Sequence, residues 1–171
     1  MKYTIDDIDV SGKRVLMRVD YNVPLGDDGS ITDDTRIRAT LPSINQLIER
    51  GAKVVLMSHM GRPKGQVVDS MRLKVAGDRL AELIDKPVES LRETVGEAVE
   101  NRVNSMSPGE VVLLENLRFN EGERDNDPNF AAALARLGDC YVNNAFGAAH
   151  REHASVSEEI TSRFSECAAG W

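Results

Sequence analysis

Polar and cationic side chains recur in this sequence directly after short apolar runs. Val54-Val55-Leu56-Met57 leads into Ser58-His59-Met60-Gly61-Arg62-Pro63, and three other runs end in the same way. In chain order, the four runs are followed by Asp20 and Asn22, by His59 and Arg62, by Arg118, and by His150, Arg151 and His153. The arginine fork donates two parallel hydrogen bonds to phosphate or carboxylate, each worth roughly 1.5–3 kcal/mol. If the loops converge, they predict a site for a small, multiply charged anion.

Taken singly, these residues have simpler interpretations. Arg118 could be a surface ion-pair partner, and His59 could be an ordinary loop histidine. Asp20 could cap a loop, and Asn22 could make only an Asx-turn. Arg36 has the least support from spacing, because a cation at the start of a helix opposes the helix dipole. Only their convergence on one site favours the anion hypothesis.

Metal and nucleotide sites have weaker support. His59, His150 and His153 could hold a metal, but arginines surround them and neither an HExxH motif nor a cysteine partner accompanies them. No GxxxxGK[ST] or GxGxxG loop follows any apolar run, so a phosphate-binding loop for a nucleotide is not visible. We therefore expect no metal and no cofactor site in this chain.

The elements that must position these residues alternate between strands and helices. Short apolar, β-branched runs predict strands at 14–19, 54–57, 111–114 and 140–143, with a short edge strand near 86–88. Apolar residues at helical spacing predict helices from residue 33 to 48, 73 to 84, 90 to 106 and 128 to 138, the last with Asp127 as N-cap. This alternation predicts an α/β fold, a three-layer α/β/α Rossmann-like domain with a mainly parallel sheet. The loops would then share one rim.

Length and composition are those of an ordinary globular protein. A chain of 171 residues, 41% of them apolar, can form one domain with a buried core. The net charge of −7 argues against a nucleic-acid partner. No run approaches the roughly 18 apolar residues of a membrane span, and the start of the chain has no apolar signal region. With only two cysteines and no metal spacing, a reduced, cytoplasmic setting fits best.

Four stretches resemble the phosphoglycerate kinase family in order and spacing. They are 18–24 (RVDYNVP), 58–63 (SHMGRP), 113–119 (LLENLRF) and 145–155 (AFGAAHREHAS). The resemblance runs over essentially the whole chain, but only to the amino-terminal half of that two-domain enzyme. It implies that residues 1–171 are a single amino-terminal substrate-binding domain and that the carboxy-terminal nucleotide-binding domain is absent.

The resemblance also implies roles for individual residues. Asp20 and Asn22 would contact the hydroxyl and carboxylate region of 3-phosphoglycerate, and its phosphate would be held by His59, Arg62, Arg118 and Arg151. Arg36 would lie near the carboxylate and act catalytically, stabilising the phosphoryl group during transfer. ATP or ADP with magnesium would bind the missing domain.

The implied reaction transfers a phosphoryl group between 1,3-bisphosphoglycerate and ADP. The substrate carboxylate is itself the nucleophile, so positioning and charge stabilisation suffice without a general base. Since the enzyme's two halves close over the reacting groups, we expect this chain alone to be inactive. The alternative hypothesis is a non-catalytic anion-binding module that works alone or docks onto a separate nucleotide-binding domain.

Overall fold

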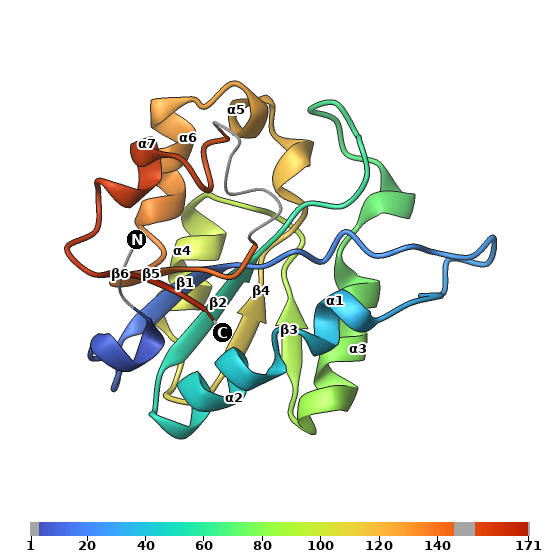
Figure 1. Ribbon diagram of the computed structural model, residues 1–171. Helices are drawn as coiled ribbons and strands as arrows, with labels where there is room; N and C mark the ends of the chain where they lie inside the picture. The colour runs from blue at the N-terminus through green and yellow to red at the C-terminus, as the bar shows by residue number, and fades with distance from the viewer. Residues whose placement is uncertain (1–3, 146–152, 171) are drawn as a thin grey trace.

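A parallel β-sheet forms the middle layer of the computed structural model, which describes residues 4–145 and 153–170 (Figure 1). In these residues six strands lie in the order β3-β4-β2-β1-β5-β6, and every paired neighbour is parallel. The strands are β1 (Arg14–Arg18), β2 (Lys53–Met57), β3 (Val88–Ser90), β4 (Val111–Leu113), β5 (Cys140–Asn143) and β6 (Cys167–Ala169). The predicted α/β class and parallel sheet are confirmed.

Helices cover both faces of the sheet, because successive strand side chains point to opposite sides. On one face Val15 and Met17 pack with α2 (Leu41–Glu49) and α3 (Lys74–Ile84). On the other, Leu16 and Tyr141 pack with α4 (Glu97–Asn104), α6 (Pro128–Ala135) and α7 (Glu158–Thr161). The two separate apolar clusters make the fold a three-layer α/β/α arrangement, as predicted.

The helix expected over 33–48 is two helices. α1 (Thr35–Arg38) ends before Thr40, and α2 starts at Leu41. Pro42 sits in the first turn of α2, where a missing N–H costs nothing, whereas inside a continuous helix its ring would clash with the carbonyl of Arg38. The buried set still includes Ile37 and Ile44, so the apolar spacing survives the break.

Two further helix boundaries were wrong. The helix expected over 90–106 is α4, which begins only at Glu97, because Ser90 belongs to the edge strand β3 and Leu91 N donates to Leu113 O at 2.8 Å. Gly96 precedes α4 with a φ of 121°, a value that side-chain-bearing residues rarely adopt. α6 begins at Pro128 as expected, with Asp127 capping Asn129 N at 3.0 Å, but ends at Ala135 rather than 138.

Several short elements had no counterpart in the sequence prediction. They are the edge strand β6, the single-turn helices α5 (Glu121–Arg124) and α7, and the 3-10 turns η1 (Ile5–Asp7), η2 (Asp69–Met71) and η3 (Leu117–Phe119). α5 and η3 lie above the sheet in Figure 1, near the loop that follows β2. None of the helices within the described ranges is long and apolar enough to cross a membrane.

Candidate anion-binding site

The loops that follow β1, β2 and β4 meet because these three strands are neighbours in the sheet. Ser58, the first residue after β2, is fully buried and binds both other loops. Its hydroxyl accepts a hydrogen bond from Tyr21 N at 2.9 Å, and its carbonyl accepts one from Leu117 N at 2.9 Å. The convergence that the anion hypothesis required is therefore present for these three loops.

Gly61 makes hydrogen bonds with both other loops. Its N–H donates to Asn22 Oδ1 at 3.0 Å, and its carbonyl accepts from Arg118 Nη1 at 3.2 Å. The residue has a φ of 64°, and a Cβ added here would lie 3.0 Å from Met71 Sδ. Glycine suits this position, since other residues pay a steric cost at positive φ. The side-chain oxygen of Asn22 thus binds the loop that follows β2, in addition to any Asx-turn within its own loop.

Arg36 lies beside Asp20 and Asn22. Its Nη1 donates to Asn22 O at 2.8 Å and to Asp20 Oδ1 at 3.4 Å. The Arg36 side chain is about half exposed (53%), and that of Asp20 is 32% exposed. The short helix α1 therefore brings together the three residues that the family resemblance assigns to the carboxylate end of the substrate.

His59 is held by a hydrogen bond from Arg18, a residue that was not predicted from sequence to belong to the site. Arg18 is fully buried at the end of β1, and its Nη2 lies 2.8 Å from His59 Nδ1. A guanidinium can only donate, so Nδ1 must be the acceptor, and chemistry assigns the ring proton of a neutral imidazole to Nε2. His59 therefore has one defined tautomer, with its N–H at Nε2.

Arg18 is one end of a buried charged chain. Its Nε donates to Ser155 Oγ at 3.0 Å, and the same hydroxyl donates to the Glu123 carboxylate. Glu123 Oε1 also accepts from Ser155 N at 2.8 Å. Burial raises the pKa of Glu123 and lowers the pKa of Arg18, while the attraction between their charges opposes both shifts. These hydrogen bonds between Arg18, Ser155 and Glu123 fix the segment around Ser155 against the sheet, next to the candidate site.

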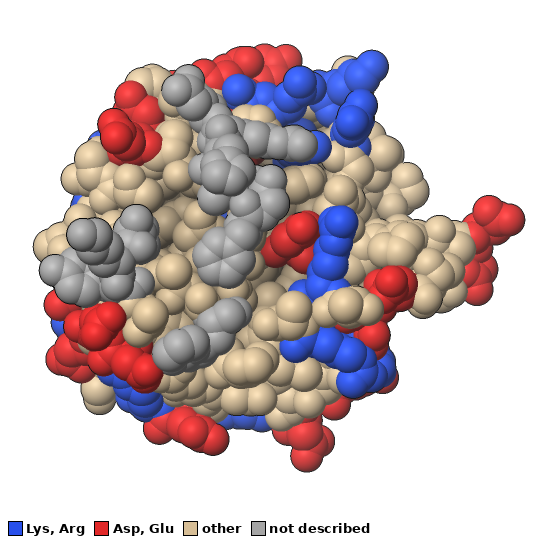
Figure 2. Space-filling model, in the orientation of Figure 1, with Lys and Arg blue, Asp and Glu red and all other residues tan. Residues whose placement is uncertain are grey.

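Cationic side chains surround a small pocket above these loops. Its volume is about 200 Å³, and its lining consists of Arg62, Lys64, Arg118, Arg124 and His153. Figure 2 shows Lys and Arg gathered at the upper edge of the molecule, the region where Figure 1 places α5 and the loop after β2. The predicted residues Arg62 and Arg118 thus share a pocket, whereas Arg151 and His150 lie outside the described residues.

Comparison with known proteins identifies the family. A family model described as phosphoglycerate kinase matches residues 5–171. The chain belongs to the phosphoglycerate kinase family. A phosphoglycerate kinase of Chloroherpeton thalassium is 54% identical over 170 residues, covering 99% of this chain and 42% of the relative. One from Synechococcus sp. CC9311 is 58% identical over 163 residues, covering 95% of this chain and 40% of the relative.

Solved structures of the family have the same fold. Phosphoglycerate kinase from Coxiella burnetii superposes with a TM-score of 0.84 at 33% identity, over 98% of this chain and 41% of that structure. The enzyme from Pyrococcus horikoshii gives a TM-score of 0.81 at 36% identity, over 90% of this chain and 39% of that structure. The chain thus spans about two fifths of the length of the phosphoglycerate kinases that it matches.

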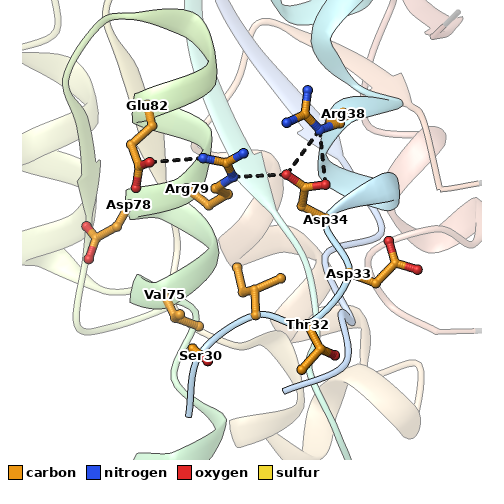
Figure 3. A pocket seen from close by; sticks show the side chains of 10 residues that line it. Ser30, Thr32, Asp33, Asp34, Arg38, Val75, Asp78, Arg79 and Glu82 are labelled. Carbon is orange, nitrogen blue, oxygen red and sulfur yellow. Dashed lines mark hydrogen bonds and ion pairs between the residues drawn. The ribbon is translucent and has the colours of Figure 1, made fainter. Parts of the chain in front are cut away.

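A larger cavity, of about 700 Å³, lies elsewhere on this phosphoglycerate kinase family member, between the loop at residues 30–34 and helix α3 (Figure 3). Asp34 lies between the two arginines of its lining, accepting from Arg38 Nε at 3.0 Å and from Arg79 Nε at 2.9 Å. These bonds hold the pKa of the Asp34 carboxyl below its usual value. The lining of this cavity holds two arginines, Arg38 and Arg79, and four carboxylates, Asp33, Asp34, Asp78 and Glu82. The excess of negative charge makes it unsuitable for an anion.

No group of three or more His, Cys, Asp or Glu that could hold a metal ion is present within residues 4–145 and 153–170. His59 is bound to Arg18, and His153 lines the cationic pocket. The described parts of these loops are thus suited to anions.

Proposed function

We propose that this chain is the 3-phosphoglycerate-binding half of a phosphoglycerate kinase. The observation that carries the proposal is the shared pocket of Arg62 and Arg118, which come from loops after two different strands. Two guanidinium groups of separate origin can hold a phosphate from two directions through charge-assisted hydrogen bonds. His59, with its N–H at Nε2, would add a third donor, and Arg151 a fourth.

The other end of the substrate would lie against Asp20, Asn22 and Arg36. Asp20 would accept a hydrogen bond from the substrate hydroxyl, and Asn22 Nδ2 would donate to the carboxylate. Arg36 would stabilise negative charge on the phosphoryl group during transfer, which is the role of a catalytic residue. Its half-exposed side chain can approach a ligand, because in residues 4–145 and 153–170 it is bonded through Nη1 alone.

The reaction of the whole enzyme would move a phosphoryl group between the acyl phosphate of 1,3-bisphosphoglycerate and ADP. The remaining part of such an enzyme would bind the nucleotide and magnesium, and its closure would exclude water from the acyl phosphate. This chain alone would bind substrate without turnover. A coupled assay with ATP and 3-phosphoglycerate should therefore give no product, and family-like activity from this chain alone would overturn that proposal.

Titration calorimetry with 3-phosphoglycerate tests the site itself. Arg62→Ala is the sharpest variant, because Arg62 is exposed and its loss leaves the loop hydrogen bonds in place. Loss of one charge-assisted contact should weaken binding by about 10-fold or more. Lys74→Ala, on the exposed first turn of α3, is the control and should bind as the wild type does. Equal affinity of Arg62→Ala and wild type would show that the phosphate binds elsewhere.

The alternative, a non-catalytic anion-binding module, makes a different prediction for the same titration. A substrate half should prefer 3-phosphoglycerate over inorganic phosphate, because Asp20, Asn22 and Arg36 add contacts at the other end of the ligand. A simple anion module should bind the two equally. An Arg36→Ala variant that loses this preference would favour the substrate half, and an absent preference in the wild type would favour the module.

A further inference from the structure

The cationic pocket contains more positive charge than the residues assigned to one phosphate provide. Lys64 and Arg124 line it together with Arg62, Arg118 and His153, and no Asp or Glu of residues 4–145 or 153–170 is in its lining. Neither Lys64 nor Arg124 has a role in the proposed function. Lys64 belongs to the loop after β2, and Arg124 is the last residue of α5.

Lys64, Arg124 and the neighbouring Arg62 differ from most other cations of the described residues in having no side-chain partner. Within the described residues, the side chains of Arg62, Lys64 and Arg124 make no hydrogen bond or ion pair. In contrast, many cations elsewhere have a carboxylate partner within 4 Å: Arg14, Arg38, Arg72, Lys74, Arg79, Arg102 and Arg136. Like charges gathered without partners repel one another, and a bound anion would remove that repulsion.

The local backbone holds the two residues in place. Lys64 has a φ of 59°, which is uncommon for a residue with a side chain, and Gly65 follows with a φ of 76°. Gly65 N donates to Arg118 O at 3.1 Å, and a Cβ on Gly65 would lie 2.4 Å from Glu121 Cγ. The loop with Lys64 therefore packs closely on the helix that carries Arg124, so both cations reach one pocket from a fixed framework.

We propose that Lys64 and Arg124 form a second anion subsite beside the phosphate position of Arg62 and Arg118, so that the site prefers small ligands with two phosphate groups. This inference rests on the proposed function, because it takes Arg62 and Arg118 as the first phosphate position. The pocket of about 200 Å³ is below the roughly 300–1,000 Å³ of pockets for larger ligands, which suits small anions. Glu121 and Asp125 line the adjoining cavity, and their negative charges would repel an anionic ligand that extended into it.

Calorimetric titration with inorganic pyrophosphate and inorganic phosphate tests the subsite. The variant is Lys64→Gln with Arg124→Gln, which removes two charges and keeps much of each side chain. Wild type should bind pyrophosphate about 10-fold or more tightly than phosphate, as expected for one added charge-assisted contact. The double variant should lose most of this preference, while its affinity for 3-phosphoglycerate changes less than about threefold.

The matched control is Lys74→Gln with Arg92→Gln, two exposed cations outside the pocket that give the same change in net charge. It should keep the preference for pyrophosphate. A double variant at Lys64 and Arg124 that keeps the preference, or a control that loses it equally, would overturn the subsite. These results are independent of whether Arg62→Ala weakens 3-phosphoglycerate binding, so failure of the subsite and failure of the proposed function can be told apart.

Discussion

Glu123 offers the sharpest test of what holds the candidate site in place. Its carboxylate is fully buried, accepts from Ser155 N at 2.8 Å and from the Ser155 hydroxyl, and faces the buried charge of Arg18. An arginine keeps its proton in proteins, so Arg18 remains charged when Glu123 is removed. Glu123→Ala should therefore leave the buried charge of Arg18 without the nearby carboxylate and the N–H of Ser155 without its acceptor.

The expected loss follows from this burial. Arg18 and Glu123 are joined through the Ser155 hydroxyl. Removing one of two opposite buried charges costs about 3–5 kcal/mol, because the remaining charge stays uncompensated in a medium of low polarity. With a urea m value of about 2 kcal/mol/M, the midpoint of unfolding should fall by about 1.5–2.5 M. Glu123→Gln should lose less, since its amide oxygen still accepts from Ser155 N.

Urea unfolding followed by far-ultraviolet circular dichroism measures this loss. Glu121→Ala is the matched control, because Glu121 lies exposed on the same helix and its loss should change stability by less than about 0.5 kcal/mol. A loss below about 1 kcal/mol for Glu123→Ala would refute the reasoning, since Arg18 would then have its charge balanced by other groups.

Two further substitutions test the strands that carry the loops. Arg14 donates from Nη2 to Asp139 Oδ1 at 3.0 Å and holds the pKa of that carboxyl below its usual 3.8, so the stabilisation is present above pH 3.8 and is lost as pH falls through the folded pKa. Asp139→Asn should cost about 1 kcal/mol at neutral pH, a value lowered for solvent screening of this half-exposed group, and less below pH 3.8; a difference independent of pH in urea unfolding would contradict this. Gly138→Ala would place Cβ 2.8 Å from Leu16 Cβ and 3.1 Å from Leu16 N. Because Leu16 belongs to β1 and its backbone is held in the sheet, the free energy of unfolding should fall by about 1–3 kcal/mol. An unchanged free energy of unfolding would mean that β1 can shift to make room.

The strands were predictable because each is a short apolar run rich in β-branched residues. All four main strands appear within a residue of the expected bounds, since a buried parallel strand leaves little choice of residue type. β6 was missed because Cys167-Ala168-Ala169 is weakly apolar and has no β-branched residue. The helix boundaries failed where a single residue decided them, as Pro42 did between α1 and α2.

The loops of the candidate site were predictable, but the groups beneath them were not. His59, Arg62 and Arg118 follow strands directly, and the parallel topology alone brings such residues to one rim. Arg18 lies within the strand pattern itself, and its partner Glu123 is distant in sequence. The one available signal was the position of Arg18 at the end of an apolar strand, because a buried charge there requires a partner.

The placement of acidic groups near the site explains how an acidic chain keeps its cations available. Glu115 lies three residues before Arg118, yet it accepts from Arg72 Nη1 at 2.9 Å, Leu73 N at 3.0 Å and Asn116 N at 2.9 Å. With its oxygens occupied by these donors, Glu115 contributes to the loop framework. The contacts of Ser58 and Asn22 with the neighbouring loops are made by groups that carry no net charge. The field of Arg62 and its neighbours is therefore left for a ligand, as an anion site requires.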